Sequence, residues 1–245
     1  MLSPVYRVFD RLGAVLLPPR CVLCQGPGAV PGRDLCADCE ADLPWLHTAC
    51  IRCGLPQSSA SASAAHGDAC ERCRNRTQPH RICHAPFLYQ FPLTELVPAL
   101  KYQGALACAR VLGTLLAESV ARACLHGDVD VVVPMPLHRS RLVERGFNQS
   151  AELARYVTAT LPVELDIRAL QRSRATEPQV GLPRAERSRN VRGAFVAHPS
   201  LVTGRHVALL DDVVTTGATV REAARTMLAA GAARVDVWCV ARATA

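Results

Sequence analysis

The sequence predicts an α/β protein, in which a parallel β-sheet is flanked by helices and a small cysteine-rich domain precedes it. Between residues 81 and 245, short apolar segments alternate with longer segments whose apolar residues recur at helical spacing. Between residues 21 and 80, four Cys-x-x-Cys pairs occur in a stretch with few large apolar residues. We therefore expect a lead helix over residues 1–20, a metal-stabilised domain over residues 21–80 and an α/β domain over residues 81–245.

The composition fits a folded protein with anionic ligands. The 245 residues are 49% hydrophobic and carry a net charge of +7, which excludes wholesale disorder and favours phosphate-bearing partners. Lys101 is the only lysine among 28 basic residues, so a coding bias toward arginine weakens any argument from arginine number. No stretch approaches the roughly 20 apolar residues of a membrane span, and residues 1–20 lack a signal-peptide pattern. We expect a cytoplasmic protein without membrane insertion, whose thiols stay reduced.

Three apolar strands and three amphipathic helices are predicted for the α/β domain, after a lead helix over Val5–Leu17. The expected strands are Asp130–Val133, His206–Leu210 and Val235–Val240. The expected helices are Ala105–Leu125, Asn148–Leu161 and Thr219–Ala230. We expect Gly231 at the C-cap of the last helix, where a left-handed backbone favours glycine.

Each Cys-x-x-Cys pair can direct two thiolates at one ion, and two pairs complete a tetrahedral zinc site. Consecutive pairing gives one site from the first two pairs and one from the last two. A crossed arrangement, first with third and second with fourth, fits the spacing as well. The eight candidate ligands are Cys21, Cys24, Cys36, Cys39, Cys50, Cys53, Cys70 and Cys73. Redox or disulfide pairs are the less favoured alternative in a reducing compartment, so we expect two closed, structural zinc ions on which this domain depends for folding.

The segment from Val207 to Thr219 is the most informative in the chain. Apolar residues end in Asp211 and Asp212, and a Thr-Thr-Gly turn then leads into a helix. The turn and the helix N-terminus can bind a phosphate dianion through backbone N–H groups. Carboxylates would repel that phosphate, so we expect the two aspartates to accept hydrogen bonds from sugar hydroxyls and to help hold a nearby Mg²⁺. The plainer interpretation, a strand that ends in a capped turn, is less favoured because it leaves the doubled Asp and Thr without a purpose.

This segment resembles the motif with which type I phosphoribosyltransferases bind phosphoribosyl pyrophosphate (PRPP), and the chain as a whole resembles the ComF family of competence-associated, GntX-like proteins. The resemblance spans nearly all 245 residues. Besides the PRPP motif and the cysteine pairs, it rests on Leu100–Gly104, on Pro134–Arg139 with Arg145–Gln149, and on Arg174–Gln179 with Arg187–Phe195. It implies a type I phosphoribosyltransferase-like sheet with an N-terminal double zinc ribbon.

The resemblance also implies a site for PRPP with Mg²⁺. Asp211 and Asp212 would hold the ribose hydroxyls, the turn would hold the 5′-phosphate, and Pro134–Leu137 would form a pyrophosphate loop beside Arg139. The implied binding residues are Pro134, Met135, Pro136, Leu137, Arg174, Arg187, Asp211, Asp212, Val213, Val214, Thr215, Thr216, Gly217, Ala218 and Thr219. The implied catalytic residues are Asp211, Asp212, Arg139 and Lys101. Plainer roles stay open for some of them, since Pro134 could simply end a strand and Lys101 could be an exposed helix-end lysine.

Six arginines between Gln171 and Phe195 suggest a basic lid over the site, with a solvated loop as the alternative. The motifs and the family resemblance together imply two alternative functions. One is an enzyme that transfers a phosphoribosyl group from Mg²⁺-PRPP to a nitrogen nucleophile. The other is a catalytically weak protein that senses PRPP or a nucleotide, or that binds single-stranded DNA together with a competence helicase machinery. The sequence offers no certain general base.

Overall fold

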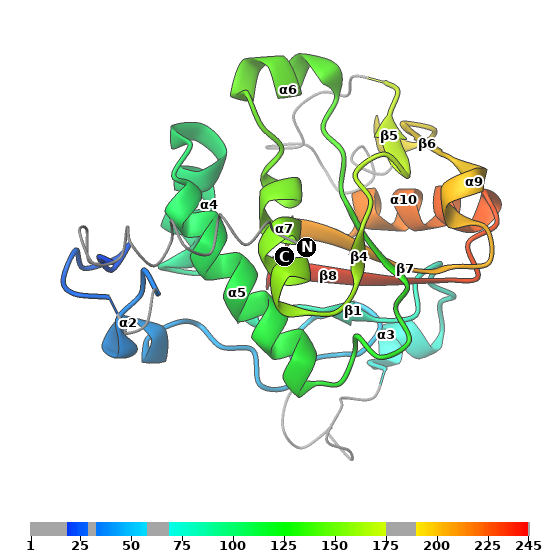
Figure 1. Cartoon of the computed structure of the whole chain (residues 1–245). Coiled ribbons are helices and arrows are strands. Elements are labelled where there is room, and N and C mark those ends of the chain that lie inside the picture. Colours follow the sequence, from blue (N-terminus) through cyan, green and yellow to red (C-terminus); the bar gives the residue numbers. More distant parts are fainter. Residues whose placement is uncertain (1–18, 29–32, 58–68, 175–189, 245) are drawn as a thin grey trace.

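The computed structural model describes residues 19–28, 33–57, 69–174 and 190–244. Within these ranges the chain forms a parallel sheet with the strand order β1-β8-β7-β3-β4, and β2 pairs with the same edge of β8 as β1 (Figure 1). The strands are β1 Cys83–His84, β2 Phe87–Leu88, β3 Val131–Pro134, β4 Glu164–Leu165, β7 His206–Val214 and β8 Arg234–Arg242. The predicted lead helix falls on residues 1–18, outside the described part of the chain.

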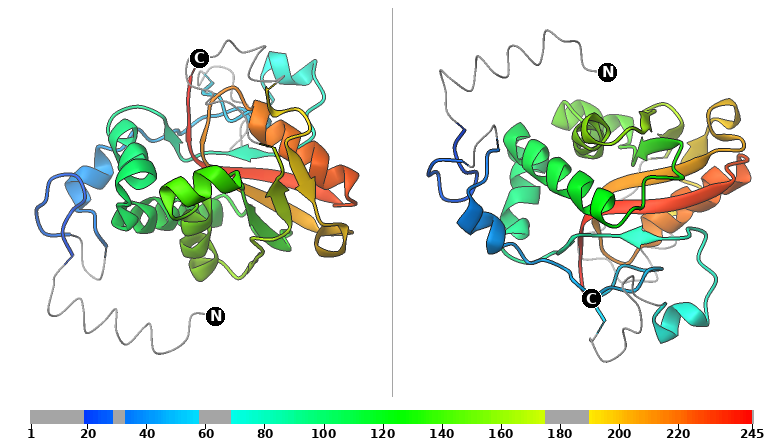
Figure 2. Two further views of the ribbon diagram at one scale, coloured as in Figure 1. Left: turned by 90° about the horizontal axis from the view of Figure 1, so that it is seen from above. Right: turned by 60° about the horizontal axis from the view of Figure 1, so that its bottom comes forward.

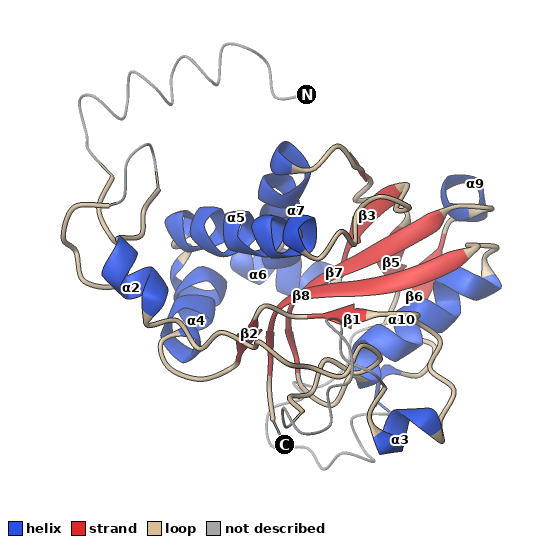
Figure 3. Cartoon of the chain, turned by 90° about the horizontal axis from the view of Figure 1, so that it is seen from below, coloured by secondary structure: helices blue, strands red, loops and turns tan. Residues whose placement is uncertain are grey.

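Helices cover both faces of this sheet. They are α2 Ala37–Ala41, α3 Glu71–Arg74, α4 Leu93–Gln103, α5 Leu106–Arg122, α6 Arg139–Arg145, α7 Gln149–Thr160, α9 Pro199–Val202 and α10 Ala218–Ala229. The helices α5 and α7 lie on one face of β7 and β8, and α10 lies on the other (Figure 3). A separate antiparallel pair is formed by β5 Leu170–Arg172 and β6 Phe195–Ala197. Among the described helices, none combines the length and the apolar character needed to cross a bilayer.

The central strands are apolar throughout because both of their faces are buried. In β7, Val207 and Leu209 join the apolar cluster that contains α10, while Ala208 and Leu210 join the cluster that contains α5 and α7. Trp238 of β8 is fully buried on the α5 side. This double burial holds the carboxyl end of β7, and the acidic residues there, in a fixed position.

The predicted elements of the α/β domain are confirmed in type, but several of their boundaries were wrong. The strand expected to end at Leu210 continues to Val214, because it keeps pairing with β8 beyond the two aspartates. The last helix ends one residue early, so that its C-cap is Ala230, and Gly231 follows with a φ of 100°. Neither α4 nor α6 was predicted, since Pro98 lies inside α4 and α6 is only 7 residues long.

The cysteine-rich region packs on the sheet and its helices at two places. Leu35 and Leu43 belong to the apolar cluster of α4 and α5, and Asp34 forms an ion pair with Arg110 of α5. Figure 2 shows α2 beside α4 and α5, and α3 beside α10. The region therefore packs against α4 and α5, on one face of the sheet. The domain boundary between residues 80 and 81 stays a prediction.

The crossing of α5 and α7 depends on a glycine, and this gives a first prediction. A Cβ atom at Gly113 would lie 2.8 Å from the Cβ of Tyr156 and 2.9 Å from the carbonyl oxygen of Leu153. We expect Gly113→Ala to lower the free energy of unfolding by about 1–3 kcal/mol, because the helices must separate. Urea denaturation measures this loss. Gly127→Ala is the matched control, since a Cβ there meets nothing within 4 Å; equal effects of the two substitutions would contradict the close approach.

Candidate functional site

Asp211 and Asp212 lie near the carboxyl end of β7, at the edge where open parallel sheets place their ligands. The ammonium group of Lys101, from α4, forms an ion pair with Oδ2 of Asp212. Burial opposes the charge on Lys101, but the neighbouring Asp212 outweighs it and raises the pKa of the ammonium group. The only lysine of the chain is therefore not an exposed helix-end residue. It supplies a fixed positive charge beside the two carboxylates.

Asp211 has a different environment from Asp212. Its Oδ1 accepts a hydrogen bond from the Ser150 hydroxyl at 3.3 Å and one from the backbone N–H of Asp212 at 3.0 Å. Burial, and then the adjacent Asp212 carboxylate, raise the pKa of Asp211 to about 8, against the opposing effect of Lys101. Near neutral pH the pair thus carries about one negative charge, which Lys101 balances. The two carboxyl groups can lie side by side at this edge because Asp211 favours its protonated form and Lys101 forms an ion pair with Asp212.

The expected phosphate-binding turn follows β7 directly. Gly217 is the N-cap of α10 and has a φ of 73°, in the left-handed region that favours glycine. No side chain caps the helix from this position. The Thr216 hydroxyl accepts a hydrogen bond from the N–H of Ala218 at 3.3 Å. The turn therefore presents a helix N-terminus beside the two aspartates, the arrangement that favours a bound anion.

Arg242, at the end of β8, ties this turn to the cysteine-rich region. Its guanidinium donates to the carbonyl oxygen of Val214 at 2.8 Å, to that of Thr215, and to that of Cys53 at 2.7 Å. The residue is only 4% exposed, and among the described residues its hydrogen-bond partners are carbonyl groups, with no carboxylate. A buried cation that no described carboxylate neutralises adds positive potential to the turn and thereby favours an anion there.

The expected pyrophosphate loop lies next to Asp211, because Pro134 at the end of β3 pairs with Leu210 of β7. The N–H of Met135 donates to the carbonyl oxygen of Leu210 at 2.8 Å, and the Asn148 amide donates to the carbonyl oxygen of Met135 at 3.1 Å. Pro134 is thus both the end of a strand and the start of the loop Pro134–Leu137. Arg139 is exposed at the first position of α6.

The basic segment, which contains the six arginines between Gln171 and Phe195, is described only up to residue 174 and from residue 190 onward. The pairing of β5 with β6 brings these two ends together. Arg174 donates to the carbonyl oxygens of Asn190 at 3.0 Å and Arg192 at 2.8 Å, so it joins the two ends of the segment. The N–H of Gly193 donates to Glu222 of α10 at 2.8 Å, so the C-terminal end of the segment is held against α10. Arg187, Thr176 and Gln179 lie outside the described residues.

The eight paired cysteines form two groups, Cys21/Cys24/Cys36/Cys39 and Cys50/Cys53/Cys70/Cys73. The consecutive pairing is therefore the one adopted, and the crossed arrangement was wrong. The Sγ atoms of Cys24 and Cys36 are 3.8 Å apart, and those of Cys53 and Cys70 are 3.9 Å apart. Tetrahedral Zn–S bonds of about 2.3 Å place two sulfurs about 3.8 Å apart. Both groups fit zinc, and both are closed sites of four thiolates.

Two family models match different parts of the chain. Residues 12–74 match the double zinc ribbon domain family, and residues 142–245 match the phosphoribosyl transferase domain family. The DNA utilization protein YhgH of Escherichia coli K12 is 35% identical over 229 residues, which cover 92% of this chain and 98% of the relative. The chain belongs to the ComF family. Competence protein F of Haemophilus influenzae is 28% identical over 229 residues, 91% of this chain and 97% of the relative, and competence protein ComFC of Bacillus subtilis is 28% identical over 209 residues, 83% and 81%.

Three side chains around the candidate site were not predicted as site residues, namely Asn148, Ser150 and Arg242. Asn148 and Ser150 begin α7, where the Asn148 side chain caps the helix by accepting from the Ser150 N–H at 3.0 Å. An Asn at a predicted helix start is a visible capping signal, but it says nothing about a ligand. Arg242 ends a long apolar strand, and its contact with Cys53 joins residues 189 positions apart. Sequence spacing alone could not reveal that contact.

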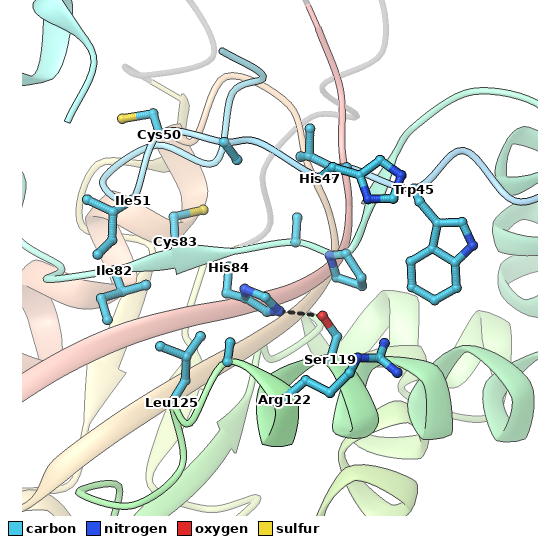
Figure 4. Close-up of a pocket in the computed structure, with 15 residues that line it drawn as sticks. Trp45, His47, Cys50, Ile51, Ile82, Cys83, His84, Ser119, Arg122 and Leu125 are labelled. Carbon is cyan, nitrogen blue, oxygen red and sulfur yellow. Dashed lines mark hydrogen bonds between the residues drawn. The ribbon is translucent and has the colours of Figure 1, made fainter. Parts of the chain in front are cut away.

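A separate cavity of about 410 Å³ lies between the zinc ribbon, β1 and the end of α5 (Figure 4). Trp45 and His47 line one side of it, and Arg122 of α5 lines another. A hydrogen bond of 2.8 Å joins His84 Nε2 to the Ser119 hydroxyl. None of the predicted PRPP-binding residues lines this cavity.

The two cysteine groups predict the metal content. We expect about two zinc ions per chain, from eight thiolates at four per ion. Cys70→Ser should lower the content to about one, because the second group loses a ligand. Elemental analysis of purified protein measures this directly. Cys124→Ser is the control, since Cys124 is exposed and belongs to neither group; an unchanged zinc content in Cys70→Ser would show that the second group is not a metal site.

The raised pKa of Asp211 predicts how its substitution changes stability with pH. The folded protein holds this proton up to about pH 8, whereas the ordinary pKa in the unfolded chain is 3.8. The carboxyl therefore costs stability increasingly as the pH rises from about 4 to about 8. Asp211→Asn should increase the free energy of unfolding by about 2 kcal/mol more at pH 8.5 than at pH 6, because the folded protein releases this proton between those two pH values.

Urea denaturation at the two pH values tests this difference. Asp128→Asn serves as the control, because Asp128 is exposed before the start of β3. A stabilisation by Asp211→Asn that does not grow with pH would show that the carboxyl is already ionised at pH 6.

Proposed function

We propose that this ComF-family protein binds Mg²⁺-PRPP at the carboxyl edge of its sheet and transfers the phosphoribosyl group to a nitrogen nucleophile. One observation carries the proposal: Asp211 and Asp212, balanced by Lys101, lie directly before a turn at the N-terminus of α10. Sugar hydroxyls need acceptors and a 5′-phosphate needs donors. The site offers these two kinds of group side by side and in the order in which a ribose 5-phosphate requires them.

The binding roles follow from the chemistry of each group. The carboxyl groups of Asp211 and Asp212 provide oxygens that accept hydrogen bonds from the ribose hydroxyls. Residues 213–219, with the hydroxyls of Thr215, Thr216 and Thr219, hold the 5′-phosphate. Pro134–Leu137 binds the pyrophosphate, and Arg139 contacts it. Arg174 and Arg187 are the further basic residues that we propose for contact with the substrate phosphates; of the two, the structure describes Arg174.

The protein promotes the transfer mainly by positioning the reactants and by stabilising the charges that develop on them. The bond between the ribose C1 atom and the pyrophosphate oxygen breaks, and its electron pair leaves with pyrophosphate beside Arg139. Positive charge develops on the ring, and the single negative charge shared by Asp211 and Asp212 stabilises it. The lone pair of the nitrogen nucleophile forms the new bond to C1, and its proton passes to solvent. When bound, Mg²⁺ neutralises charge on the departing pyrophosphate.

We propose that this activity serves the use of DNA by the cell. The relatives that match most of this chain are named DNA utilization protein and competence protein. A phosphoribosyl transfer fits that setting because nucleobases and nucleotides are the products of DNA breakdown. A protein that binds PRPP or a nucleotide without turnover, or that binds single-stranded DNA, is the alternative that the assays below separate.

Calorimetric titration with Mg²⁺-PRPP tests the binding site. We expect one site per chain, and a loss of affinity of at least about tenfold in Asp211→Asn/Asp212→Asn, because charge-assisted hydrogen bonds to the ribose are weakened. Asp128→Asn should leave the affinity unchanged, since its side chain lies at the opposite edge of the sheet. Wild-type protein without PRPP affinity, or a double variant that binds as tightly as wild type, would contradict the proposal.

Release of pyrophosphate tests the transfer separately. The protein is incubated with Mg²⁺-PRPP and a panel of nucleobases and amines, and we expect release with at least one acceptor and little with Lys101→Met. The reason is that Asp212 loses its counter-charge in that variant. Measurable PRPP binding with no release for any acceptor would reject the transferase and support the sensing protein.

A further inference from the structure

The cavity between the zinc ribbon, β1 and the end of α5 is distinct from the proposed PRPP site (Figure 4). Its volume of about 410 Å³ lies in the range of sites for small organic ligands. Its walls come from within residues 45–51 of the zinc ribbon, from residues 82–86 around β1, and from residues between 119 and 125 at the end of α5. Three parts of the chain that are distant in sequence therefore meet around one hollow.

The two sides of this cavity differ in chemical character. One side presents large aliphatic side chains, which are those of Ile51, Ile82 and Leu125 (Figure 4). On the other side lie Trp45, His47 and Arg122. Among the described residues that line the cavity, none is an aspartate or a glutamate. A ligand that fills this space thus meets apolar surface with one part and basic groups with the other.

Arg122 supplies a permanent positive charge on the second side. Its side chain is exposed, and the guanidinium carbon lies 5.7 Å from the centre of the Trp45 ring. The described part of the chain offers this guanidinium no ion pair with a carboxylate. A planar guanidinium binds a carboxylate through two parallel N–H···O hydrogen bonds. This side of the cavity therefore fits a ligand carboxylate.

Ser119 adds a hydroxyl group next to this guanidinium. It lies three residues before Arg122 in α5, and residues at that spacing share one face of a helix. Its oxygen is 2.8 Å from Nε2 of His84, so the hydroxyl is held in place by β1. With the proton on Nε2 of His84, the hydroxyl hydrogen of Ser119 is left to donate to a ligand oxygen. The cavity thus has a guanidinium and a hydroxyl in position to bind the same anionic group.

The second zinc site sets the orientation of such a ligand. Cys50, one of its four cysteines, lines the cavity on the side of Ile51 (Figure 4). A zinc ion with four thiolates carries a net charge of about −2. A carboxylate is repelled from that side, whereas an apolar group is not. The charge of the zinc site and the position of Arg122 therefore favour the same orientation.

We propose that this cavity binds a small organic carboxylate with an apolar body, such as an aromatic or a medium-chain aliphatic acid. The carboxylate lies against Arg122 and Ser119, and the apolar body packs against Ile51, Ile82 and Leu125. Because the ligand contacts the zinc ribbon, β1 and α5 at once, its binding stabilises their contact. The site is independent of the proposed transferase function, since none of the residues proposed to bind PRPP lines it.

Calorimetric titration of the full chain with 3-phenylpropionate and with octanoate tests the site. The corresponding amides serve as ligands with the same body and no charge. We expect at least one of the two acids to bind at one site per chain, and at least about tenfold more tightly than its amide, because charge-assisted hydrogen bonds are the stronger ones. Arg122→Gln should weaken that acid by at least about tenfold for the same reason. Arg155→Gln should leave its affinity unchanged, and it is the matched control because Arg155 is an exposed arginine of α7 outside the cavity.

Thermal unfolding gives a second readout. A saturating concentration of the acid should raise the melting temperature of the wild type and of Arg155→Gln, but not that of Arg122→Gln, because a ligand that binds only the folded state stabilises it. Arg122→Gln should retain the zinc content of the wild type, which shows that the variant is folded. The proposal is overturned if neither acid binds, if both amides bind as tightly as their acids, or if Arg122→Gln binds the acid as tightly as the wild type. Titration with Mg²⁺-PRPP is a separate experiment, so the two proposed sites can fail independently.

Discussion

The ion pair between Lys101 and Asp212 is the interaction on which the arrangement of the site depends. Two adjacent carboxylates at the end of β7 repel each other, and they can remain only if one holds a proton or a cation lies beside them. Both conditions are met, since the pKa of Asp211 is raised to about 8 and α4 brings Lys101 to its neighbour. This requirement explains why α4 must cover the carboxyl edge of the sheet. It also explains why the zinc ribbon matters to the site, because Leu35 and Leu43 pack in the same apolar cluster as α4.

A second connection links the zinc ribbon to the turn before α10, on the other side of the sheet. Arg242 binds the carbonyl of Cys53, a member of the second cysteine group, and the carbonyls of Val214 and Thr215. The ribbon thus supports both halves of the proposed ligand site: one half through the packing of α4, and the other through a buried guanidinium. A double zinc ribbon of this kind does more than append a small domain to a phosphoribosyltransferase fold. Its contacts with the α4 cluster and with Arg242 help to hold the carboxyl edge of the sheet in place.

The sequence predicted the parts of this protein that depend on local patterns. The zinc ligands follow from the Cys-x-x-Cys spacing, and the turn before α10 follows from the order of Asp, Thr and Gly between a strand and a helix. The partner of Lys101 could not be predicted, because α4 contains Pro98 and its pairing with Asp212 spans more than a hundred residues. The same limit applied to Arg242 and to the choice between consecutive and crossed zinc sites. Each of these depends on which segments meet in space, and hydrophobic periodicity does not encode that.

The most direct test of the account is hydrogen–deuterium exchange of the backbone amides in residues 213–221 with and without Mg²⁺-PRPP. If the turn and the first turn of α10 hold the 5′-phosphate, their amides should exchange more slowly when PRPP is added, and peptides from α2 and α5 should be unchanged. Protection should disappear in Asp211→Asn/Asp212→Asn, because the ribose is no longer held beside the turn. Exchange in residues 213–221 that is the same with and without PRPP would contradict the central claim.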